Sequence, residues 1–346
     1  MDAAQSQIVE KLKQKINGAN LPPDVLEKIN DEIVRIELTI RNKEFNPELD
    51  RHISYVNFIT ELPWNNKSKD ILDLKRAKAI LDKNHHGLTG IKDRILEYLS
   101  ILILNDYKGQ VAKQPVLAFV GLVGSGKTSL AYSIAESLGR PIVRIPFGGL
   151  GSALQLRGES RVKSEAEPGL VMKALKRAQV KNPVILLDEL DRVTENARAD
   201  IMGVLVELLD PEQNMGFLDH YVGFPFDLSE VLFIATANNT GNVATAVMDR
   251  LELLEMPFYS DDQKIVIGKS YLLPQALKNA GLDPAIIQVA DDAWPNIVRP
   301  LGFDGGIRSL NRHIVGLVGK LARLVVEGQK GPFLINNQTL SQYFQA

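Results

Sequence analysis

Apolar positions repeat at helical spacing through the first eighty residues. Ile8, Leu12 and Ile16 recur every four residues, as on one face of a helix. A longer series follows at Val25, Ile29, Ile33, Ile36 and Ile40. Two shorter series continue at Tyr55, Phe58, Ile59 and Leu62, and then at Ile71, Leu74, Ala77 and Leu81. Ser68 and Asp70 are suited to begin the last of these helices, so residues 1–83 are expected to form a helical region.

The pattern changes over residues 84–258 to short apolar runs of strand type. These runs cover residues 116–120, 142–145, 184–187 and 231–235. Helical stretches alternate with them at 127–138, 170–179 and 201–209. Buried strands alternating with helices are typical of a parallel sheet covered on both faces, which predicts an α/β domain.

A smaller, all-α domain is expected over residues 259–346. Helical periodicity returns at 261–280, 291–299 and 306–327, where Asp261 and Asp304 can serve as start signals. No strand-like run is predicted after Pro257.

Composition narrows the class of protein. The chain has 346 residues, enough for two or three domains, with 45% hydrophobic and 24% charged residues. The net charge of −2 gives no overall basic field for nucleic acid, and the absence of cysteine excludes disulfides and thiolate metal sites. Neither a secretory signal nor a membrane span is recognised, so no membrane partner is expected.

Residues 121–128 read Gly-Leu-Val-Gly-Ser-Gly-Lys-Thr and fit the phosphate-loop motif G-x-x-x-x-G-K-[ST]. A strand precedes the motif and a helix begins near Lys127, which is the context that the motif requires. Glycines let backbone N–H groups face phosphate oxygens, Lys127 can reach the β- and γ-phosphates, and the Thr128 hydroxyl can ligate Mg²⁺. The predicted phosphate-binding residues are Gly121, Gly124, Ser125, Gly126, Lys127, Thr128 and Ser129.

Polar residues end two later apolar runs. Asp188 and Glu189 follow residues 184–187, and Asn238 follows the run that begins at Val231. Ligands of open α/β sheets bind at the carboxyl ends of the strands. Asp188 is therefore expected to hold Mg²⁺ through water, Glu189 to polarise the attacking water, and Asn238 to position it. The alternative for Asp188-Glu189 is a solvated helix start.

Longer stretches resemble the ATPase portion of the Lon protease family, which is of the AAA+ class. They are Leu-Pro-Trp at 62–64, His86-Gly87-Leu88, Ile-Lys-Asp-Arg-Ile-Leu-Glu-Tyr-Leu at 91–99, Leu-Asp-Pro-Glu-Gln-Asn at 209–214, and Asp-His-Tyr at 219–221. The resemblance runs from about residue 20 to the end of the chain. It implies an AAA+ core with an N-terminal helical segment and a helical small domain.

The resemblance also assigns residues that spacing leaves open. Arg250 matches the arginine finger that reaches the nucleotide of a neighbouring subunit, and Arg308 matches the sensor arginine of the small domain. The segment that cups adenine is matched by His86, Gly87, Leu88 and Ile91, with His86 in place of the usual Tyr. The family implies ATP and Mg²⁺ as cofactors and hexameric rings that unfold protein substrates for proteolysis.

Two departures from the family pattern bear on function. Arg157, Gly158 and Arg161 match its substrate-gripping loop, but Lys163 and Ser164 replace the aromatic–aliphatic pair. A hydrated lysine lacks the contacts of an aromatic ring, so either threading by this loop is lost or the neighbouring loop 214–221 supplies the grip. The second departure is that the sequence ends where the small domain ends. We expect no Ser–Lys peptidase site in it, whether it is an excised piece or a stand-alone ATPase.

Three functions follow, from three different classes. The leading one is a Lon-like ATPase that hydrolyses ATP with Mg²⁺ in a ring and remodels protein, alone or with a partner protease. The second is a nucleotide-gated regulatory or scaffold subunit. The third is a nucleic-acid motor. Its support is a basic helix face at Lys75, Arg76, Lys78 and Lys83, which is more simply interpreted as a solvated surface. The expected location is the cytoplasm, with the mitochondrial matrix or the peroxisome as alternatives.

Overall fold

The computed structural model describes residues 3–41, 48–299 and 305–343. Contacts divide the chain into two compact units. The first unit comprises residues 1–73, 99–118 and 134–253, and the second unit comprises residues 74–98, 119–133 and 254–346.

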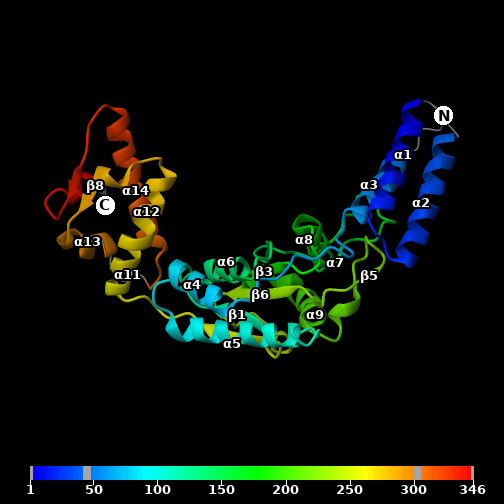
Figure 1. The fold of residues 1–346 in the computed structure, drawn as a ribbon, viewed down its shortest axis with the longest axis horizontal. Coiled ribbons are helices and arrows are strands. Elements are labelled where there is room, and N and C mark those ends of the chain that lie inside the picture. The colour runs from blue at the N-terminus through cyan, green and yellow to red at the C-terminus, as the bar shows by residue number, and fades with distance from the viewer. Residues whose placement is uncertain (1–2, 42–47, 300–304, 344–346) are drawn as a thin grey trace. The chain divides into compact units, whose positions relative to one another are not determined.

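Three N-terminal helices pack side by side in the first unit (Figure 1). They are α1 (Ala3–Gly18), α2 (Pro23–Arg41) and α3 (Leu49–Thr60). The apolar series predicted for α2 is buried throughout, as is the series predicted for α3. In α1 the expected face is wrong by one position: Ile8 is 39% exposed and Val9 takes its place beside Leu12 and Ile16. Both series have helical spacing, so the periodicity alone did not separate them.

The start predicted for the fourth helix at Ser68 and Asp70 is wrong, because α4 covers Leu74–Asn84. The Ser68 backbone N–H and hydroxyl both donate to Asn182 Oδ1, at 2.9 and 3.1 Å. Asp70 accepts two hydrogen bonds from the Arg140 guanidinium, at 2.8 and 2.6 Å. These tertiary bonds use the groups that would otherwise have capped a helix.

The predicted parallel sheet is confirmed. It has five strands in the order β2-β3-β6-β1-β7 and is flanked by helices. The strands are β1 (Val116–Val120), β2 (Ile142–Pro146), β3 (Val184–Asp188), β6 (Leu232–Ala237) and β7 (Leu251–Glu255). The accompanying helices are α5 (Thr89–Asp106), α6 (Lys127–Leu138), α7 (Leu154–Arg157), α8 (Leu170–Ala178), α9 (Arg198–Leu209) and α10 (Thr245–Met248).

The register of the central strands determines which polar residues meet. β3 pairs in parallel with β6, with Val184 opposite Leu232 and Leu187 opposite Ala235. One step further along, this register brings Asp188 beside Thr236. The carboxyl ends of β3 and β6 therefore form one edge, as the sequence predicted.

A small antiparallel hairpin of β4 (Phe217–Leu218) and β5 (Pro225–Phe226) was not predicted. The N-terminal helices lie against it within the first unit. The Tyr55 hydroxyl donates to Val222 O at 2.8 Å, and the rings of Trp64 and Phe226 are 5.0 Å apart between centroids. Strands of two residues are too short to give a period in the sequence.

The C-terminal part of the second unit is mostly helical and has its own apolar core (Figure 1). Its helices are α11 (Asp261–Ile267), continued by a π-helical turn (Gly268–Leu272), α12 (Leu273–Asn279), α13 (Trp294–Val298), α14 (Arg308–Val326) and α15 (Leu340–Tyr343). The α11 start is as predicted, since Ser260 and Gln263 form a capping box ahead of it. Asp304 lies outside the described residues.

The expectation of no strand after Pro257 is wrong. β8 (Ile287–Val289) pairs in parallel with β9 (Phe333–Ile335). Each strand has three residues, so the pairing depends on packing across the unit rather than on a local pattern. Short 3₁₀ turns complete the described chain at Leu190–Arg192, Glu195–Ala197, Asn214–Gly216, Pro284–Ile286 and Asp291–Ala293.

Candidate nucleotide-hydrolysis site

The phosphate loop adopts a conformation that requires glycine. Gly124 and Gly126 have φ values of +83° and +96°, which side chains with a Cβ rarely adopt. A Cβ on Gly124 would also lie 2.9 Å from the backbone nitrogen of Arg308. The loop therefore needs glycine at this position for its own shape and for the close approach of α14.

Lys127 begins α6 and folds over the loop. Its Nζ donates to Gly121 O at 2.6 Å and to Leu122 O at 2.8 Å, and the residue is 8% exposed. The Ser125 hydroxyl is buried and has no hydrogen-bond partner within the described part of the chain. A glycine-shaped cradle, a lysine held over it and an unsatisfied hydroxyl fit a triphosphate.

Arg308 lies beside the phosphate loop, within the second unit. Ile307 N donates to Gly124 O at 3.0 Å, which fixes the first turn of α14 against the loop. The Arg308 side chain is exposed at this point. Tyr259, which the sequence did not indicate, donates from its hydroxyl to Ser125 O at 3.1 Å and fixes the loop from another side.

The predicted adenine segment forms a tight bend ahead of α5. Gly87 and Leu88 both have left-handed backbone, with φ values of 66° and 54°. Leu88 and Ile91 are buried, and His86 is half-buried. A left-handed leucine is strained, and such strain is concentrated at functional sites.

His85 rather than His86 makes the polar contact to α6. Its Nε2 lies 2.9 Å from the Ser133 hydroxyl, and its backbone carbonyl accepts from Lys92 Nζ at 2.6 Å. Burial, together with the Lys92 charge, lowers the pKa of His85 from 6.5 to about 4, against a weaker opposing effect of the Ser129 backbone.

We expect His85 to make folding stability depend on pH. A histidine whose folded pKa lies below its unfolded value of 6.5 stabilises the protein above pH 6.5, and that stability is lost as the pH falls toward about 4. The shift corresponds to about 3 kcal/mol at most. The free energy of unfolding is measured with urea at neutral pH and near pH 4.5. Its difference between the two pH values should be smaller for His85→Gln than for the wild type. Equal differences would mean that the ring is not buried as a neutral group. The exposed His220, replaced in the same way, is the control.

Asp188 and Glu189 are held by a hydroxyl that the sequence did not single out. The fully buried Thr236 donates to Asp188 Oδ1 and accepts from Glu189 N at 3.0 Å. Arg144 Nε donates to Asp188 Oδ2 at 2.6 Å. Glu189 has left-handed backbone, with φ 60° and ψ 52°. Asp188 is buried rather than solvated, which is at odds with the alternative of a solvated helix start.

Removing the Thr236 hydroxyl should disturb the Asp188 carboxylate and the Glu189 backbone at once. We expect Thr236→Val, which keeps the side-chain shape, to lose about 1–3 kcal/mol of stability, because a buried N–H and a carboxylate oxygen lose their partner. Thr236→Ser keeps the hydroxyl and is the control. Chemical denaturation of the two variants measures the difference, and equal midpoints would show that the hydroxyl is not needed.

Asn238 is oriented by a buried carboxylate, Asp191. Its backbone N–H donates to Asp191 Oδ1 at 2.9 Å, and its Nδ2 lies 3.4 Å from Asp191 Oδ2. Asp191 is 6% exposed, and its Oδ2 also accepts a hydrogen bond from Asn239 Nδ2 at 3.4 Å. The only sequence signal for Asp191 was its place in the run Asp-Glu-Leu-Asp, three residues after Asp188. The 3₁₀ turn at Leu190–Arg192 brings its carboxylate back to the sheet edge where β3 and β6 end.

Arg250 bonds to acceptors of its own chain within the first unit. Its Nη2 lies 2.8 Å from Asp210 Oδ2, and its Nη1 donates to Ala246 O at 2.7 Å. The Glu212 backbone N–H and the Arg250 guanidinium hold the pKa of Asp210 below its ordinary value. Arg250 is thus held in one orientation by Asp210. The same carboxylate stabilises its turn by accepting hydrogen bonds from Glu212 N and Gln213 Nε2. Sequence spacing gave no sign of this pair.

The loop at 157–169 has a fixed base and an exposed tip. Asp219, which is fully buried, accepts from Gly169 N at 2.8 Å and from the N–H groups of Tyr221 and Val222. Burial raises the pKa of this carboxyl, and those N–H groups act against the rise. At the tip Val162 is 93% exposed, and Lys163 Nζ lies 3.5 Å from Glu159.

Neither a metal cluster nor a membrane-spanning helix is found in the described part of the chain. Over the described ranges, no group of three or more His, Cys, Asp or Glu residues could hold a metal ion. Over the same ranges, no helix has the length and apolar character needed to span a bilayer. The Mg²⁺ site at Thr128 and Asp188 stays a prediction.

Comparison with known proteins gives consistent similarities. Residues 117–257 match the family described as ATPase family associated with various cellular activities (AAA). The chain is 41% identical over 335 residues to the Lon protease of Lawsonia intracellularis, covering 97% of this chain and 40% of that protein. It is 40% identical over 345 residues to Lon protease 2 of Thermus thermophilus, covering 97% and 42%, and 37% identical over 342 residues to the Lon protease of Fusobacterium nucleatum, covering 99% and 44%. The chain thus spans about two fifths of the length of these relatives.

Proposed function

Because the chain belongs to the Lon protease family through its AAA+ ATPase portion, we propose that it hydrolyses ATP with Mg²⁺ in a ring and thereby drives protein unfolding and translocation for proteolysis. The observation that carries the proposal is the pair Asp188 and Glu189, fixed by Thr236 at the carboxyl end of β3. In the sheet order β1, which leads into the phosphate loop, is the neighbour of β6. The carboxyl ends of such strands form the ligand edge of an α/β sheet.

Each residue then has a stated task. The loop amides and Lys127 hold the phosphates, while Thr128 and Asp188 would hold Mg²⁺, which supplies positive charge for the phosphoryl oxygens. Glu189 accepts a proton from the attacking water, and Asn238, aligned by Asp191, orients that water. Arg308 contributes charge from the first turn of α14. His86, Gly87, Leu88 and Ile91 take the adenine.

Ring assembly is the finer part of the proposal. Arg250 would complete the site of the next subunit, so each copy would depend on its neighbour. The division at residues 83 and 258 into helical, α/β and small domains belongs to the same proposal. The cytoplasmic location is part of the proposal as well.

A second candidate function has its own support. At the tip of the 157–169 loop, Lys163 forms an ion pair with Glu159, and Ser164 beside it is exposed. Neither side chain offers the apolar surface that grips a polypeptide. A regulatory or scaffold subunit, in which nucleotide controls assembly without threading, accounts for that loop.

ATP turnover measured against protein concentration separates the two candidates. An assembling ATPase gives specific activity that rises steeply with concentration, and stimulation by an unfolded protein such as casein adds the threading function. Nucleotide binding with flat, negligible turnover would favour the regulatory subunit.

A further inference from the structure

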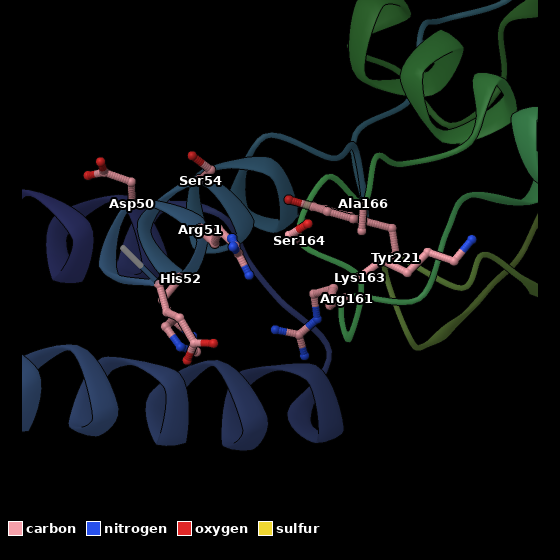
Figure 2. A pocket seen from close by; sticks show the side chains of 10 residues that line it. Asp50, Arg51, His52, Ser54, Arg161, Lys163, Ser164, Ala166 and Tyr221 are labelled. Atoms are coloured by element: carbon pink, nitrogen blue, oxygen red, sulfur yellow. The ribbon is translucent and has the colours of Figure 1, made fainter. Parts of the chain in front are cut away.

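A cavity of about 320 Å³ lies between α3 and the loop at 157–169, within the first unit (Figure 2). On the side of α3 it is lined by Glu48, Asp50, Arg51, His52 and Ser54. The opposite side is formed by Arg161, Lys163, Ser164, Ala166 and Tyr221. Beside the tip of the loop, the cavity thus combines three cationic side chains (Arg51, Arg161 and Lys163) and two carboxylates with the apolar surface of Ala166 and Tyr221.

Arg161 is fixed in place before any ligand arrives. Its Nη1 lies 2.9 Å from Glu32 Oε1, and its guanidinium carbon is 3.6 Å from the centroid of the Tyr55 ring. Burial would raise the pKa of Glu32, but hydrogen bonds from Arg161 and His52 hold it below its ordinary value. A guanidinium has five N–H donors, and this bond to Glu32 uses one of them. Arg161 therefore retains donors for a second carboxylate.

Arg51 faces Arg161 across the cavity. Figure 2 shows the two guanidinium groups directed toward one another, while the Asp50 carboxylate and the Ser54 hydroxyl point away. Within the part of the chain that the structure describes, Arg51 has no hydrogen bond or ion pair. Two guanidinium groups that face each other are suited to bind one carboxylate through paired N–H donors.

We propose that this cavity binds an acidic side chain of an extended polypeptide. The carboxylate lies between Arg51 and Arg161, and an adjoining apolar side chain packs against Ala166 and Tyr221. The cavity is larger than a lone carboxylate needs, and Ala166 and Tyr221 give it an apolar part, which favours a peptide over a small inorganic anion. This inference rests on the proposed handling of polypeptides. The cavity would hold a polypeptide by its charge, whereas the loop has Lys163 and Ser164 in place of an aromatic–aliphatic pair that grips it.

Fluorescence anisotropy of a labelled peptide that alternates Glu and Leu tests the proposal. The matching peptide carries Gln in place of Glu. We expect Arg51→Gln to weaken binding of the acidic peptide about tenfold, because the glutamine amide cannot make a charge-assisted hydrogen bond to the carboxylate. Arg177→Gln, an equal charge change on the exposed side of α8, is the matched control and should leave binding unchanged. Arg51 is exposed, so its replacement should not impair folding.

Three results would overturn the proposal: equal affinity for the Gln peptide, unchanged binding by Arg51→Gln, or displacement of the acidic peptide by equimolar inorganic phosphate. ATP turnover of each variant is measured alongside. Normal turnover with no peptide binding rejects the cavity and leaves the ATPase standing, whereas absent turnover in the wild type rejects the proposed function itself.

Discussion

Glu189→Gln is expected to bind ATP as the wild type does and to turn it over at least about 10²-fold more slowly. The amide keeps the size of the side chain but cannot accept a proton from water. The left-handed backbone at this position and the hydrogen bond from Glu189 N to Thr236 do not involve the carboxylate, so the variant should fold normally. Binding should persist because the phosphate-loop residues are unchanged.

Turnover at saturating ATP and the affinity for a fluorescent ATP analogue measure the two halves of this expectation. Glu195→Gln is the matched control, because Glu195 is exposed on the following 3₁₀ turn and should leave turnover unaffected. Near-normal turnover by Glu189→Gln would remove the role assigned to this residue. Weak ATP binding instead would place Glu189 among the groups that hold the nucleotide.

The parts of the site that the sequence revealed are those encoded locally. The phosphate loop is a continuous motif between a strand and a helix, Asp188 directly follows an apolar run, and Asn238 comes three residues after another. Parallel strands bring such residues to one edge whatever else the fold contains. The sheet and the N-terminal helices were recognised from local patterns too, since the buried strands are continuous apolar runs and the helices repeat apolar residues along one face.

The residues that orient the site were missed because they act across the fold. Thr236 reaches Asp188 and Glu189 through the register of β3 with β6, which no single stretch of sequence encodes. His85 and His86 are equivalent in the sequence, and only packing against Ser133 shows which of them is buried. The pair of Arg250 and Asp210 joins the end of α9 to the start of β7.

Arg250→Ala is expected to lower ATP turnover by about 10³-fold or more if the residue completes a neighbour's site. Loss of the side chain leaves Asp210 with hydrogen bonds from Glu212 N and Gln213 Nε2, at 2.9 and 3.0 Å, so the turn should keep its shape. ATP binding by each isolated subunit should therefore be retained. Single-turnover and steady-state assays at high protein concentration measure the loss.

Mixing separates a role in the neighbour's site from a role within the chain. Arg250→Ala and Glu189→Gln subunits should each be inactive alone, yet in mixed rings a Glu189→Gln subunit can offer its Arg250 to the intact Glu189 next to it. When equal amounts of the two variants assemble at random, roughly a quarter of the interfaces should join an intact Glu189 to an intact Arg250. Those sites should be active, because the same head-to-tail interface repeats around the ring. If Arg250 instead serves only its bond to Asp210, mixing restores nothing and Asp210→Asn reproduces the loss of activity. Asp210→Asn that keeps turnover, together with recovery on mixing, would place Arg250 in the adjoining site, with Asp210 as the group that orients it until the subunits meet.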